Sequence, residues 1–208
     1  TPTHYMLIAW DVEGDSLIFN RTLSGRVRLE GNKYVEDATQ ASVQLFDDIK
    51  VNFFWKLEGD IFTQSGTIVR PDGKVVTLEA LVFRRSRYRK PQSGNPAIGT
   101  WIQTSSHSTM ADGKTQSSFN PADKRLLIVT PTHWMRMDHK GEKFDGVFYG
   151  TYSQEDDTIS SVLTYSSSPM EKNVTLRQKV EGNRLQIIST GQAPDGKPAT
   201  VYDTFEKQ

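Results

Sequence analysis

Apolar and polar residues alternate in short runs along most of the chain, and this alternation predicts β-strands from one end to the other. The segment 50–58 shows the pattern clearly, because Val51, Phe53, Trp55 and Leu57 stand at every second position. Turn-forming residues separate such runs at intervals of roughly 8–12 residues. The pattern is typical of an antiparallel, all-β protein.

The second half of the chain contains about eight predicted strands. They occupy residues 98–107, 125–130, 133–138, 144–154, 158–166, 173–181, 184–190 and 199–206. A set of about eight antiparallel strands is enough to close an up-and-down barrel, and a β-sandwich is the alternative.

The first half of the chain shows the same kind of alternation in fewer strands. These are predicted at residues 5–11, 16–28, 33–39, 50–58, 61–68 and 74–84, with a short helical turn at residues 40–48.

Short motifs recur in the same order in the two halves. Thr-Pro-Thr-His-Tyr-Met at residues 1–6 returns as Thr-Pro-Thr-His-Trp-Met at residues 130–135. Lys-Leu-Glu-Gly-Asp at residues 56–60 returns as Lys-Val-Glu-Gly-Asn at residues 179–183, and Pro-Asp-Gly-Lys at residues 71–74 returns unchanged at residues 194–197. Because order and spacing are nearly kept, the chain is interpreted as two copies of one domain.

The predicted domains are a first repeat at residues 1–88, a linker at residues 89–97 and a complete second barrel at residues 98–208. The linker contains two prolines and a glycine, and its first two residues end a basic run that reaches Lys90. The first repeat has no counterpart of residues 99–129, so about two strands of its barrel are missing. Either a preceding segment or a partner chain, such as a second copy, would complete it.

The two halves also predict which side chains face inward. Met135 and Met137 are matched by the apolar residues Met6 and Ile8, so both are expected inside, and Trp134 is expected on the other face. A strand glycine marks a bend or bulge, and such a bend is expected at Gly150 and at Gly25.

One polar residue, Gln178, lies on the predicted interior face of the second barrel, where Trp55 lies in the first repeat. A polar side chain there needs a partner, which is either protein, water or a ligand. The aromatic residues Phe148, Tyr152 and Tyr202 either fill the core or line a cavity. The candidate ligand-binding residues are Met135, Met137, Phe148, Tyr152, Leu176, Gln178 and Tyr202.

Catalytic and metal-binding motifs are absent from the sequence. There is no cysteine, no metal-ligand spacing of histidines, and no nucleophile or phosphate-binding motif. His4 and His133 stand at the same repeat position, and each is expected to make a side-chain hydrogen bond at the start of a strand. The prediction is therefore a non-enzymatic protein with no cofactor and no metal.

The net charge and the hydropathy of the chain restrict the kinds of binding partner that we expect. The formal net charge is zero, which argues against nucleic acid as a partner. No apolar run approaches the roughly 20 residues of a membrane-spanning helix, and no signal peptide is present.

The second half resembles a known family. Gly99-Thr100-Trp101 is followed by Leu126–Trp134 as one run and then by Gly150-Thr151-Tyr152, and this ordered set resembles the lipocalin-like domains of unknown function in exported Bacteroidetes proteins. The Gly-x-Trp start is similar to that of lipocalins, whose Trp plugs the closed end of the barrel. Lipocalins usually place an Arg over this Trp, whereas this chain ends in Glu206-Lys207-Gln208.

This resemblance implies two calycin-type barrels in an exported protein, whether periplasmic, outer-membrane-associated or secreted. It also implies a small apolar or amphipathic ligand in the second barrel. The alternative function is a structural or protein-interaction module in which side chains fill the barrels.

Overall fold

The computed structural model describes residues 3–14, 16–42, 50–70, 72–84, 94–167, 173–192 and 197–208. The chain divides into two compact units, Thr1–Lys90 and Pro91–Gln208, and each is described by itself. All regular structure in the described residues is β-strand, as the alternation predicted.

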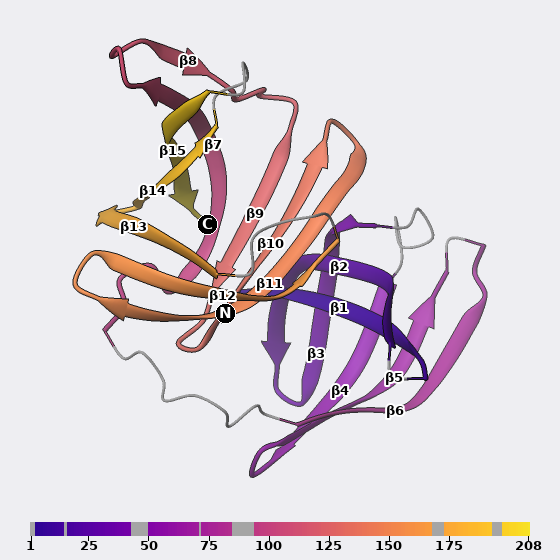
Figure 1. The fold of residues 1–208 in the computed structure, drawn as a ribbon. Coiled ribbons are helices and arrows are strands. Elements are labelled where there is room, and N and C mark those ends of the chain that lie inside the picture. Colours follow the sequence, from indigo (N-terminus) through magenta and orange to yellow (C-terminus); the bar gives the residue numbers. More distant parts are fainter. Residues whose placement is uncertain are drawn as a thin grey trace. The chain divides into compact units, whose positions relative to one another are not determined.

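The first unit is an open, curled half-barrel of six antiparallel strands (Figure 1). Its strands pair in sequence order, so β1 and β6 are the two edges of the sheet. The strands are β1 His4–Glu13, β2 Ser16–Glu30, β3 Lys33–Ala41, β4 Lys50–Glu58, β5 Ile61–Val69 and β6 Val75–Arg84.

The second unit is a closed antiparallel barrel, because β7 pairs with both β9 and β15 (Figure 1). The short strand β8 adds to the edge of β7 and stands outside the ring of eight. The strands are β7 Gly99–Met110, β8 Thr115–Ser117, β9 Lys124–Val129, β10 His133–Lys140, β11 Lys143–Glu155, β12 Thr158–Ser166, β13 Asn173–Glu181, β14 Arg184–Gln192 and β15 Pro198–Lys207. The barrel is thus confirmed over the sandwich.

Some predicted elements differ in detail. Strand β8 was not predicted, because Thr115–Ser117 is too short to show an alternation. Gln40 and Ala41 end strand β3, and the rest of the predicted helical turn falls mostly outside the described residues. Most of the predicted linker, residues 89–93, also lies outside them.

Two strand glycines allow the sheets to bend, as predicted. The ladder shifts register at Gly25 in the first unit and at Gly150 in the second. A Cβ on Gly25 would lie 2.1 Å from the Asp37 carbonyl oxygen, and one on Gly150 would lie 2.4 Å from that of Val162. Only glycine permits this approach of neighbouring strands.

Each unit also begins its Thr-His strand in the same way. Thr3 Oγ1 lies 2.9 Å from His4 Nδ1, and Thr132 Oγ1 lies 2.7 Å from His133 Nδ1. The predicted hydrogen bond at the start of each strand is therefore confirmed.

Trp101 anchors the core of the barrel. Its side chain is completely buried, and Nε1 donates a hydrogen bond of 2.7 Å to the carbonyl oxygen of Ala97. Ala97 is itself buried, so the end of the predicted linker belongs to the barrel core. The cation that lies over the Trp101 ring is Lys207.

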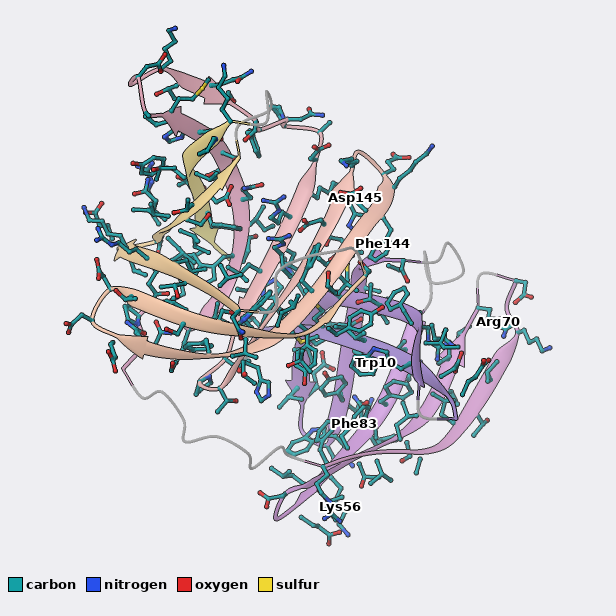
Figure 2. All side chains as sticks on the ribbon, in the orientation of Figure 1. Trp10, Lys56, Arg70, Phe83, Phe144 and Asp145 are labelled. Carbon is teal, nitrogen blue, oxygen red and sulfur yellow. The ribbon has the colours of Figure 1, made fainter. Side chains whose placement is uncertain are left out.

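The closed barrel buries the inner face of its sheet more completely than the open half-barrel does. Phe62 on β5 lies opposite Phe83 on β6, and Leu185 on β14 lies opposite Phe205 on β15 in the same way. Phe83 is 37% exposed at the edge of the half-barrel (Figure 2), whereas Phe205 is 2% exposed inside the barrel. The open edge of the half-barrel therefore leaves part of an apolar face in contact with solvent.

Candidate ligand cavity in the barrel

The barrel interior contains a cavity of about 180 Å³ with predominantly apolar walls. Its apolar side chains come from seven strands that converge on the interior. They are Leu127, Val129, Trp134, Tyr152, Ile159, Leu163, Val174, Leu176, Leu185, Ile187 and Phe205.

The alternation along β13 places its apolar side chains in this cavity. Val174, Leu176 and Gln178 all line it, because residues two apart in a strand share a face. The inward face predicted for this strand is thus confirmed.

A chain of hydrogen bonds satisfies the polar groups at the cavity wall. Gln178 Nε2 donates to Asn95 Oδ1 at 2.9 Å, and Asn95 Nδ2 donates to the Tyr152 hydroxyl at 3.0 Å. The Tyr152 hydroxyl donates in turn to the Thr130 carbonyl oxygen at 2.7 Å. Gln178 therefore has a protein partner, as expected of a core amide, while its side chain also lines the cavity.

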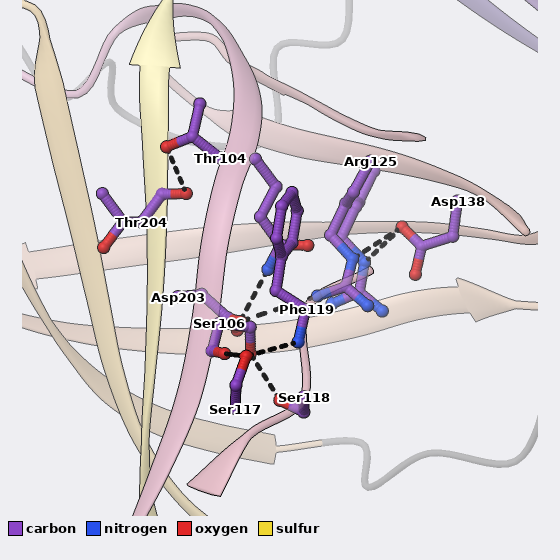
Figure 3. Close-up of polar contacts among 11 residues, drawn as sticks. Thr104, Ser106, Ser117, Ser118, Phe119, Arg125, Asp138, Asp203 and Thr204 are labelled. Carbon is purple, nitrogen blue, oxygen red and sulfur yellow. Dashed lines mark hydrogen bonds and ion pairs between the residues drawn. The ribbon is translucent and has the colours of Figure 1, made fainter. Parts of the chain in front are cut away.

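Four charged side chains form a cluster inside the barrel. Arg125 Nε lies 3.1 Å from Asp138 Oδ1, and Arg125 Nη1 lies 3.7 Å from Asp203 Oδ1 (Figure 3). Arg136 Nε also lies 3.1 Å from Asp138 Oδ1. Gln103 Nε2 donates to Asp203 Oδ1 at 2.7 Å. Opposite charges therefore pair here, which offsets part of the cost of removing them from water.

This cluster stands between two cavities. Arg136 and Asp203 line the apolar cavity, whereas Arg125 and Asp138 line a second cavity of about 190 Å³ with mostly polar walls. Ion pairs therefore lie at the boundary between the apolar cavity and a more polar one.

The electrostatics of Arg136 reflect this position. Burial lowers the pKa of its guanidinium, while Asp138 raises it and Arg125 lowers it further. An arginine titrates so far above neutral pH that the guanidinium remains charged.

The barrel wall is incomplete beside the apolar cavity. The ladder between β13 and β14 ends at the pair Arg177–Ile188. Val174 and Ser189 lie beyond that end and line the cavity. The two strands therefore leave the cavity without continuous backbone pairing at this side.

Three of the predicted ligand-binding residues do not line the apolar cavity. Met135 and Met137 project from the outer face of β10, because Trp134 and Arg136 on the same strand point inward. Tyr202 also points outward and stacks on His107 with ring centres 4.9 Å apart. These three assignments to the interior were wrong, since the strands present the opposite face.

The other four predicted residues do lie in the interior. Tyr152, Leu176 and Gln178 line the cavity, and the Phe148 ring lies beneath the Arg136 guanidinium with 4.1 Å between Cζ and the ring centre. Trp134 and Arg136 were missed as lining residues, although the alternation of β10 allowed only the two methionines or these two to face inward.

The half-barrel carries a polar group on its inner face. The Glu36 carboxylate accepts a hydrogen bond of 3.5 Å from Gln64 Nε2 and faces the hydroxyl groups of Tyr5 and Tyr34. Burial raises the pKa of Glu36, and the three neighbours offset part of this effect. The Phe62 ring lies beside this group, 5.8 Å from that of Tyr34.

The described residues contain neither a metal-binding cluster nor a membrane-spanning helix. No group of three or more His, Cys, Asp or Glu side chains in them could hold a metal ion. Nor do they contain a helix long and apolar enough to cross a membrane.

Comparison with protein-family models and with curated proteins finds no match to this chain. The assignment of a function therefore depends on the cavity and the sheet edges.

Proposed function

We propose that the barrel is a non-enzymatic, lipocalin-like binding domain for a small amphipathic molecule. The observation that carries this proposal is the apolar cavity with a few polar groups at its wall. The closed barrel and the buried Trp101 support the lipocalin-like assignment.

The cavity volume limits the size of the ligand. Pockets for drug-sized molecules have volumes of roughly 300–1,000 Å³. An engineered cavity of about 150 Å³ in another protein holds benzene. The cavity of about 180 Å³ therefore suits a single small ring or a short alkyl chain.

The test is titration of the full chain with benzene and 1-hexanol, followed by the NMR shifts of the Leu127 and Ile187 methyl groups. Saturable shifts at these two residues are expected. A matched pair of variants decides whether the cavity is the site. Leu176→Phe fills the cavity and should abolish the shifts, whereas Thr175→Phe adds the same ring on the exposed face and should retain them. Wild-type protein that shows no shift with either probe would exclude the proposal.

A second function is favoured by the half-barrel. We propose that it is an interaction module completed by a second copy of the chain. Its edges β1 and β6 lack strand partners within the described residues, and Leu57, Leu81 and Phe83 on its inner face are 48%, 36% and 37% exposed. Because β1 and β6 are antiparallel, a two-fold axis sets β6 of one copy beside β1 of the other in antiparallel pairing.

The barrel itself provides the test of this interaction. Residues 99–129 supply β7 and β9, which bridge β10 and β15. When grafted before Thr1, they join the Thr-Pro-Thr-His motif in the same sequence context as in the barrel. Wild-type protein is expected to be a dimer by native mass spectrometry, and the grafted protein a monomer that binds less of an apolar dye. A monomeric wild-type protein would contradict this second function.

A further inference from the structure

Arg136 brings a positive charge to the wall of a predominantly apolar cavity, which Asp203 also lines. Its Cζ lies over the Phe148 ring, and its Nε lies 3.1 Å from Asp138 Oδ1. The side chain keeps 23% of its surface accessible, although Nε is fully buried. The accessible part therefore belongs to the remainder of the side chain, which lines the cavity.

Each carboxylate of the cluster also contacts a side chain other than Arg136. Asp138 Oδ1 is shared between Arg136 and Arg125, each with Nε at 3.1 Å. Asp203 Oδ1 accepts from Gln103 and pairs with Arg125. Arg136 Nε itself makes no hydrogen bond within the described residues despite its approach to Asp138. A guanidinium has five N–H donors, and the four on the two Nη atoms are the ones that can reach a ligand.

We propose that the ligand of the apolar cavity is a small carboxylate whose head group pairs with Arg136 and whose apolar tail contacts Leu127 and Ile187. The inference rests on the binding function proposed for the barrel. A carboxylate accepts two parallel N–H bonds from a guanidinium, a geometry that a hydroxyl or a primary amide oxygen does not reproduce.

The free-energy cost of burying the Arg136 guanidinium also favours an anionic ligand. Removal of a cation from water is unfavourable unless an anion compensates it, and burial is the main cause of the lowered pKa of this guanidinium. A ligand carboxylate would add an anionic partner for the Nη atoms of Arg136, beyond the nearby Asp138 and Asp203.

The charged residues at positions 136 and 138 have no charged counterparts in the first half of the chain. When the Thr-Pro-Thr-His motifs are aligned, Leu7 and Ala9 stand where Arg136 and Asp138 stand in the barrel. A leucine at position 136 is therefore compatible with a strand of this kind, which makes Arg136→Leu a suitable test variant.

The experiment compares hexanoate with hexanamide, which share chain length and a planar head group but differ in charge. Isothermal titration of the full wild-type chain at pH 7 is expected to show hexanoate binding about tenfold to a hundredfold more tightly, as a charged hydrogen bond requires. Arg136→Leu should remove this preference and leave hexanamide affinity unchanged within about threefold. Arg177→Leu makes the same replacement on the exposed face of β13 and should retain the preference.

The outcomes separate the two proposals. Equal binding of both probes by the wild-type chain would overturn the role of Arg136 and leave a binding cavity. Absence of binding by either probe, together with unresponsive cavity methyl groups, would overturn both. If Arg136→Leu does not fold, Arg136→Lys keeps the charge without the forked donors, and an unchanged preference in that variant would overturn the paired geometry.

Discussion

Lys207 Nζ lies 5.3 Å from the centre of the Trp101 ring and places a cation over the aromatic side chain that anchors the barrel core. Trp101 is completely buried, whereas Lys207 is exposed. The last strand of the barrel thus contributes a contact to the first, and the family resemblance had suggested an arginine in this role.

The contribution of this contact can be measured by a double-mutant cycle. Lys207→Ala is expected to lower the free energy of unfolding of the barrel by about 0.5–1 kcal/mol, the value of an exposed cation–π contact. Trp101→Leu should cost about 2–4 kcal/mol, because it removes the aromatic ring and leaves the Ala97 carbonyl oxygen without its donor. Denaturant unfolding gives both values, and additive effects in the double variant would show that the two side chains do not interact.

Gly150 should be intolerant of any side chain. Gly150→Ala is expected to cost more than about 2 kcal/mol, because the new Cβ would lie 2.4 Å from the Val162 carbonyl oxygen and 3.1 Å from Trp134 Nε1. Gly141→Ala is the control, since a Cβ there meets no atom within 4 Å, and only the strain of its positive φ of 59° remains. Thermal unfolding should rank Gly150→Ala as the more damaging change, and the reverse ranking would contradict the close approach of the strands.

The Tyr152 hydroxyl should stabilise the segment that leads into the barrel. It links Asn95 to the Thr130 carbonyl oxygen, so Tyr152→Phe leaves one buried and one part-buried polar group with one partner fewer. A loss of about 1–3 kcal/mol is expected in denaturant unfolding. Tyr202→Phe retains its stacking on His107 and should change stability by less than about 0.5 kcal/mol.

The fold followed from the sequence because strand alternation and turn chemistry are local properties. Along β13, the residues of one face alternate with exposed polar ones, and the interior was assigned correctly to Leu176 and Gln178. Along β10, both faces carry large side chains, and hydrophobicity alone favoured Met135 and Met137 over Trp134 and Arg136 as inward residues. The two-residue period of a strand allowed either face of β10 to point inward, and the choice of the more apolar face was wrong.

The physical reason is the charged cluster. Arg136 can face inward because Asp138, two residues further along the same face, pairs with it and with Arg125. Asp203 likewise faces inward, which turns its neighbour Tyr202 outward. Such pairs join different strands, so a single-strand pattern that assigns charge to the outside cannot anticipate them.

Glu36 should make the half-barrel sensitive to pH. Burial raises its pKa above the ordinary value of 4.5, so the folded state binds a proton more tightly than the unfolded state. The resulting contribution to stability is fully present below the unfolded pKa and is lost as pH rises through the folded pKa.

Glu36→Gln removes the charge and keeps an oxygen that accepts from Gln64, and it is expected to stabilise the half-barrel at neutral pH. Unfolding midpoints from pH 4 to pH 8 should fall less steeply for the variant than for the wild-type protein. Glu58→Gln is the matched control, because the exposed Glu58 pairs only with the exposed Lys56 among the described residues and should leave the slope unchanged. Parallel slopes for wild-type protein and Glu36→Gln would show that this carboxylate does not titrate with folding.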